Sequence, residues 1–221
     1  MLCTTTRKLF EAEPLHPEVQ RYFERHGEVN DDPLPLVKIL SRCHGVQEML
    51  QALPTVLVPD GDVRLLNCDL AERAALAFDQ RHPDWGPLCA FVEAARSAAI
   101  SSADPMRAAD LLASNAEKVH GVLAKCTGKG SVHLAARDAA AAVEGCLAPL
   151  NHSRSKSARI AYSAVEAIAS FAAANHTGRR SYAWGKDTAW MDAMRREEAW
   201  QRKCVTEWLA KQDATSPGGA A

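Results

Sequence analysis

The sequence lacks long apolar runs. No stretch approaches the roughly 18 apolar residues that a membrane-spanning helix requires. The N-terminal sequence MLCTTTRKLF also lacks the apolar segment of a secretion signal. We therefore expect a soluble protein of the cytoplasm, with no membrane partner.

Metal-binding and disulfide motifs are missing as well. The seven Cys are an odd number and no two lie closer than 20 positions apart, so there is no CxxC pair. The eight His form no HExxH motif and no His/Cys pair with ligand spacing, since the adjacent Cys43 and His44 point in different directions on a helix. This distribution is typical of reduced thiols in a cytoplasmic protein, and it predicts no metal site and no cofactor.

Motifs of phosphate chemistry are incomplete. The segment CTGKGS at 126–131 has Gly130 where a phosphate-binding loop needs Ser or Thr after its Lys, so it predicts a turn. Residues 151–157 read as a polar, basic loop, and the basic side chains around it have no interleaved aromatic residue. We expect no nucleic-acid partner and no enzyme activity.

Alanine is abundant, with 40 occurrences among 221 residues. Because Ala is the best helix former and capping residues recur, the sequence predicts a single all-α, bundle-like domain of eight or nine helices, short at the N-terminus and long later. We expect a flexible lead-in at 1–16, the domain at 17–211, a disordered tail at 212–221 and no strand. The expected helices are 17–26, 33–44, 46–53, 63–80, 86–100, 105–125, 132–147, 159–174 and 182–211.

Charge is distributed unevenly. Residues 1–105 hold 10 Lys and Arg against 16 Asp and Glu, whereas residues 106–221 hold 16 against 11. An acidic N-terminal half could attract a basic partner, although ordinary surface variation gives the same pattern. Within this half, Asp69 and Arg73 lie four apart on a predicted helix and can form an ion pair.

The last predicted helix places polar residues on an apolar stripe. Glu197 and Gln201 share one face with four apolar residues, Trp190, Met194, Cys204 and Trp208. One interpretation is a buried, mutually supporting polar pair that fixes helix register. In that case Glu197→Ala leaves a partner unsatisfied, at about 1–3 kcal/mol. The other is a contact surface bordered by Trp200.

Two regions, LVKILSRCHGVQEMLQAL with the following DGDVRLLNCDLAERAA, and REEAWQRKCVTEWL near the C-terminus, resemble an alanine-rich, all-helical family of immunity proteins from bacterial toxin–immunity systems, also found in phages. The helical hairpin and the segment that follows it are similar to the N-terminal signature of that family. The C-terminal segment is similar to its Glu-x-x-Trp-Gln ending. The resemblance implies a helical protein that binds and neutralises a cognate toxin or effector without chemistry of its own.

The sequence therefore leads to one main hypothesis and two alternatives. The main hypothesis is a cytoplasmic, non-catalytic inhibitor that binds a cognate protein through some of Glu197, Trp200, Gln201, Asp69 and Arg73. A phage protein that counters host defence, or a helical scaffold, is the first alternative. An enzyme with a dispersed site built from Glu197, Asp69 and Arg73 is the second.

Overall fold

Helices make up almost the whole of the computed structural model, which describes residues 2–11, 29–42, 46–100, 105–128, 131–149, 152–177 and 188–215. The structure is 82% helical over these residues, so the predicted all-α class is confirmed. Among the described helices, none combines the length and the apolar character that crossing a bilayer demands.

The chain begins with short elements and continues with long ones. The short elements are β1 (Cys3–Thr4), α1 (Thr6–Glu11), β2 (Leu34–Pro35), α3 (Leu36–Arg42), α4 (Val46–Leu50) and the 3-10 turn η1 (Leu53–Thr55). The long helices are α5 (Asp60–Arg81), α6 (Leu88–Ile100), α7 (Pro105–Lys125), α8 (Ser131–Cys146), α9 (Ser153–Thr177) and α10 (Thr188–Thr215).

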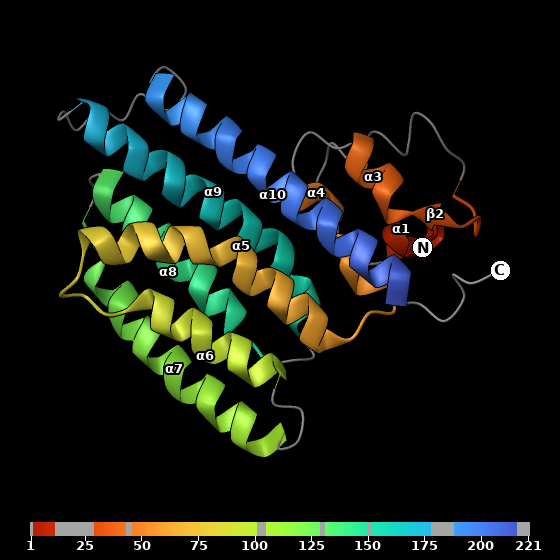
Figure 1. The fold of residues 1–221 in the computed structure, drawn as a ribbon, viewed down its shortest axis with the longest axis horizontal. Coiled ribbons are helices and arrows are strands. Elements are labelled where there is room, and N and C mark those ends of the chain that lie inside the picture. Colours follow the sequence, from red (N-terminus) through yellow and green to blue (C-terminus); the bar gives the residue numbers. More distant parts are fainter. Residues whose placement is uncertain are drawn as a thin grey trace.

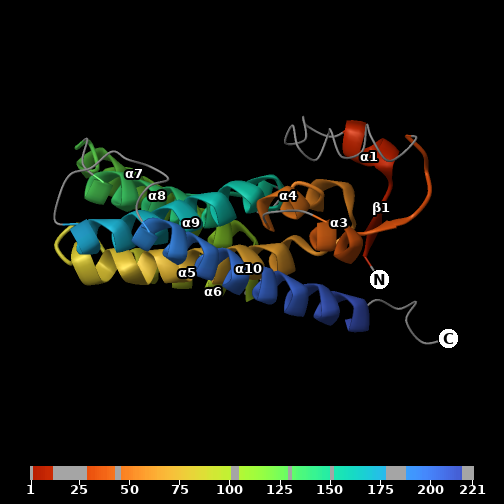
Figure 2. The same ribbon diagram turned by 90° about the horizontal axis from the view of Figure 1, so that it is seen from above.

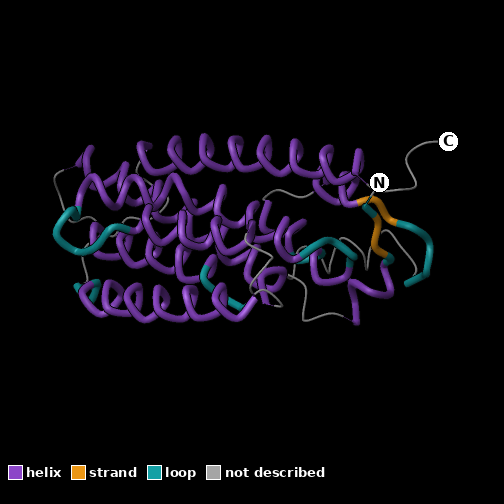
Figure 3. Tube along the Cα trace, turned by 60° about the horizontal axis from the view of Figure 1, so that its bottom comes forward, coloured by secondary structure: helices purple, strands orange, loops and turns teal. Residues whose placement is uncertain are grey.

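Helices α5, α8 and α9 pack against one another and form the centre of the bundle. Figure 1 shows α10 along its upper edge and α7 along its lower edge, and in Figure 3 the long helices run roughly side by side. The periodicity of α5 explains its place, because every residue of its predicted apolar face is buried: Val63, Leu66, Leu70, Ala74 and Phe78.

Alanine and glycine allow α8 and α9 to approach closely. The buried faces of the two helices consist largely of Ala, including Ala139 on α8 and Ala164 on α9, both with no exposed surface. A Cβ atom built on Gly145 of α8 would lie 2.5 Å from Cγ1 of Ile160 on α9. The abundance of Ala that predicted the helices thus also sets how tightly they pack.

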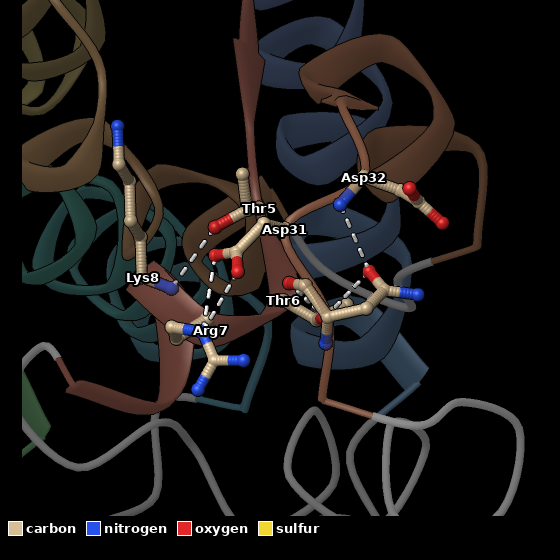
Figure 4. Close-up of polar contacts among 7 residues, drawn as sticks. Thr5, Thr6, Arg7, Lys8, Asp31 and Asp32 are labelled. Atoms are coloured by element: carbon tan, nitrogen blue, oxygen red, sulfur yellow. Dashed lines mark hydrogen bonds and ion pairs between the residues drawn. The ribbon is translucent and has the colours of Figure 1, made fainter.

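The N-terminal residues 2–11, where the sequence predicted a flexible lead-in, form β1 and α1. β1 pairs with β2 in a two-stranded antiparallel sheet, which the sequence also did not predict. Figure 4 shows polar contacts between α1 and the segment before β2, among them the pair of Arg7 with Asp31. Arg7 Nε lies 3.0 Å from Asp31 Oδ1, and Thr6 Oγ1 donates to the Asn30 carbonyl. Figure 2 places this unit at one end of the long helices.

Several helix boundaries differ from the prediction, most informatively the start of α9 and the end of α10. Helix α9 begins at Ser153, inside the expected loop at 151–157, because Arg154 anchors its first turn: its guanidinium lies 2.8 Å from Asp60 Oδ1 and donates to the carbonyls of Val56 and Val58. Helix α10 continues to Thr215, four residues into the predicted tail at 212–221. The predicted helix at 17–26 lies outside the described residues.

Candidate functional site

The residues singled out in the sequence meet where α5 and α10 pack. Arg73 on α5 reaches Glu197 on α10, with 3.1 Å between Arg73 Nε and Glu197 Oε2. The Arg73 guanidinium also lies over the ring of Trp200, 4.8 Å from its centroid. A cation positioned over an indole ring is attracted by the ring's quadrupole. One arginine therefore joins a buried carboxylate to an aromatic side chain.

Burial differs sharply across this group. The Glu197 side chain is 0% exposed, whereas the Arg73 side chain is 45% exposed. Loss of water raises the pKa of Glu197, and the Arg73 charge and the Gln201 amide act in the opposite direction. The carboxylate therefore lies in an environment that disfavours its charge, and Arg73 is its ion-pair partner.

Gln201 links the same site to a third helix. Its side chain is fully buried, and its Nε2 donates to the Ala161 carbonyl on α9 at 3.1 Å. Among the described residues, neither oxygen of Glu197 nor Oε1 of Gln201 accepts a hydrogen bond of good geometry. The predicted burial of Glu197 and Gln201, on a stripe that faces the Ala-rich helices, is confirmed, and the stripe also carries unsatisfied polar atoms.

Asp69 belongs to a neighbouring network. Its carboxylate pairs with Arg96 on α6, at 3.0 Å between Arg96 Nη2 and Asp69 Oδ1, and the expected pair with Arg73 does not form. Arg96 also contacts Glu72 at 3.4 Å and Glu93 at 3.6 Å. Burial raises the pKa of Asp69, and Arg96 opposes that shift. Sequence spacing missed Arg96, because it sits on another helix.

The residues of these two networks that are not buried form one outward-facing surface, which we call the α5 surface. Asp69, Glu72, Arg73 and Leu76 fall at helical spacing along α5, and all four are exposed. Glu93 and Arg96 border them on α6, and Trp200 borders them on α10; in Figure 1, α5 lies between these two helices. Leu76 is a large apolar side chain that remains 51% exposed. The surface thus combines carboxylates, an aromatic-backed arginine and an exposed leucine.

Other sequence features do not gather into a site. Within the part of the chain that the structure describes, no group of three or more His, Cys, Asp or Glu could hold a metal ion. Residues 126–128 lie in a loop after α7, and 129–130 are outside the described ranges. The basic segment that suggested a solvated loop contributes Arg154 to internal contacts.

Comparison with known proteins does not assign this chain to a family. No family model, no curated protein and no solved structure matches this chain significantly. The resemblance to immunity proteins therefore stays a prediction that rests on the sequence segments quoted above.

Proposed function

We propose that this chain is a non-catalytic protein-binding inhibitor of the immunity type, which binds a cognate toxin or effector protein through the α5 surface. The observation that carries the proposal is Arg73, held over Trp200 and tethered to buried Glu197. Arginine and tryptophan are enriched among residues that dominate interface energies. A guanidinium fixed before binding also loses less conformational entropy when a partner arrives.

The charge of the surface indicates the character of the partner. Asp69, Glu72 and Glu93 share the single guanidinium of Arg96, so the carboxylates outnumber the cation there. Their side chains are half or more exposed and can accept hydrogen bonds from incoming groups. This arrangement favours a partner that presents basic side chains, in keeping with the acidic N-terminal half of the chain.

The alternatives use the same residues differently. A dispersed enzyme site would need Glu197 to reach a substrate, yet that side chain has no exposed surface. A phage protein that counters host defence would bind through a surface of the same kind, so only the identity of the partner separates it from an immunity protein. We therefore choose an experiment that identifies a partner and locates its contact surface.

The test pairs this protein with the product of the neighbouring upstream gene. Expression of that product alone should arrest growth, and co-expression of this chain should restore it. Isothermal titration calorimetry should show a complex that Arg73→Ala and Trp200→Ala each weaken by roughly thirtyfold or more, the scale of a hot-spot residue of about 2 kcal/mol.

Lys118→Ala is the matched control, because Lys118 is exposed on α7 and lies outside the α5 surface. It should leave the affinity within roughly twofold. Failure of the two proteins to associate would overturn the inhibitor proposal for that pair. Association that neither Arg73→Ala nor Trp200→Ala weakens would remove the α5 surface from it.

A further inference from the structure

A cavity of about 540 Å³ lies between α7, the C-terminal end of α8 and the first turns of α9. None of its lining residues belongs to the α5 surface. Its volume falls in the range of about 300–1,000 Å³ that is usual for small-molecule sites in proteins. The space exists because its walls are made largely of small side chains, among them Ala113 and Ala116 of α7 and Ala141 of α8.

Four charged or titratable side chains join this apolar lining. His120 of α7 and Glu144 of α8 pair with each other, at 2.7 Å between His120 Nε2 and Glu144 Oε1. Lys156 and Arg159 come from α9, one turn apart near its N-terminus. Among the described residues, neither of these two cations forms an ion pair.

Lys156 and Arg159 both line the cavity from the first two turns of α9. Glu144 is hydrogen-bonded to His120, whereas Lys156 and Arg159 carry two positive charges in the first two turns of a 25-residue helix. The N-terminus of a helix adds a partial positive charge of its own. An anionic group would be stabilised there, and the Ala-lined remainder suits a hydrocarbon chain that has no polar atoms to satisfy.

We propose that this cavity binds an aliphatic chain with a terminal carboxylate, that is, a fatty acid. The carboxylate lies between Lys156 and Arg159, and the chain runs along the Ala-lined walls between α7 and α8. Arginine and lysine both form charge-assisted hydrogen bonds with carboxylates. The inference does not depend on the proposed inhibitor function, because the two sites share no residue.

Dodecanoate, carrying ¹³C in its carboxyl group and kept below its micellar concentration, is the probe. Calorimetry of the full-length protein should show one bound molecule per chain. The carboxyl carbon resonance of bound dodecanoate should titrate at lower pH than that of the free acid, because two cations stabilise its charged form. Dodecanol and dodecyltrimethylammonium should each bind at least roughly tenfold more weakly, since neither offers an anion.

The double variant Lys156→Gln, Arg159→Gln should weaken dodecanoate binding by at least roughly tenfold and abolish the shift in its titration. Its matched control is Lys38→Gln, Lys118→Gln, which removes two exposed charges outside the cavity and should leave binding unchanged. Equal losses in both double variants would overturn the site, because the effect would then follow net charge. Binding of dodecanol as tight as that of dodecanoate would overturn the carboxylate assignment.

Filling the cavity tests the location of the chain. Ala141→Phe should prevent binding while far-ultraviolet circular dichroism confirms the fold. If that variant does not fold, Ala116→Leu is the smaller replacement on the opposite wall and should weaken binding in proportion to the volume lost. Unchanged binding in a folded filling variant would show that dodecanoate does not occupy this cavity.

Discussion

Replacing Glu197 with glutamine removes a charge from the protein interior while keeping the shape of the side chain. Glu197 has no exposed surface, and Arg73, which pairs with it, is 45% exposed. Water can solvate Arg73 after the substitution, but water does not reach the Glu197 carboxylate in the native state. We therefore expect Glu197→Gln to stabilise the protein at neutral pH, because it ends a desolvation penalty that the ion pair only partly offsets.

The raised pKa of Glu197 determines how the stability difference between Glu197→Gln and wild type changes with pH. Burial raises the pKa of Glu197 in the native state above its ordinary value of 4.5. At a pH between the ordinary pKa and the raised native-state pKa, the native state therefore binds more protons than the unfolded state. The contribution of Glu197 to stability then falls as pH rises through that window. Each unit of pKa displacement corresponds to about 1.4 kcal/mol once both states are ionised. The advantage of Glu197→Gln should grow over the same window and become constant above it.

Urea unfolding from pH 4 to pH 8 measures this difference. Glu197→Ala is the companion variant, since it removes the same charge but also leaves a cavity and leaves Gln201 with less support. It should be about 1–3 kcal/mol less stable than Glu197→Gln at every pH. If Glu197→Gln is instead less stable than wild type at neutral pH, and the deficit widens as pH rises, attraction to Arg73 exceeds desolvation and our account of the site is wrong.

The remaining predictions concern two glycines in the helices and the arginine at the start of α9. Gly145→Ala should destabilise the protein by about 1–3 kcal/mol in urea unfolding, because its Cβ would lie 2.5 Å from Ile160 Cγ1. Gly121→Ala, on α7 with nothing within 4 Å of its Cβ, should instead stabilise by about 0.5–1 kcal/mol, and a loss there would contradict the packing argument. Arg154→Ala should lower the free energy of unfolding by about 1.5–3 kcal/mol, whereas exposed Ser155→Ala should change it little; equal effects would refute the proposed anchor.

Sequence periodicity predicted the long helices because local physics controls them. The apolar residues of α5 repeat at helical spacing, and the Ala content of α8 and α9 favours helix whatever their neighbours are. The stripe on α10 likewise showed that Glu197 and Gln201 would be buried. Each of these conclusions depends only on the spacing of residues within one helix, and that spacing can be read from the sequence.

Spacing within one helix does not predict contacts between segments that are distant in the sequence. The expected pair of Asp69 with Arg73 considered only one helix, whereas each residue found its partner elsewhere: Arg96 lies 27 positions from Asp69, and Glu197 comes from α10. The helical start at Arg154 depends on Asp60 and two carbonyls about 95 residues away. The sequence also did not predict the cavity. Alanines that line a cavity and alanines that pack in a core have the same spacing along an Ala-rich helix.

The presence of a carboxylate at the buried position of Glu197 bears on function. A neutral side chain of the same shape should give a more stable protein, so stability alone does not favour a carboxylate at this position. What the carboxylate does, and glutamine does not, is hold the Arg73 guanidinium with a full charge while the Trp200 ring supports its other side. If the α5 surface binds a partner, Glu197→Gln should therefore raise the free energy of unfolding at neutral pH and at the same time weaken association, since Arg73 would lose its fixed orientation. Calorimetric titration with the partner, beside urea unfolding of the same sample, measures both quantities. A variant that gains stability and binds as tightly as wild type would show that Glu197 does not position Arg73 for binding.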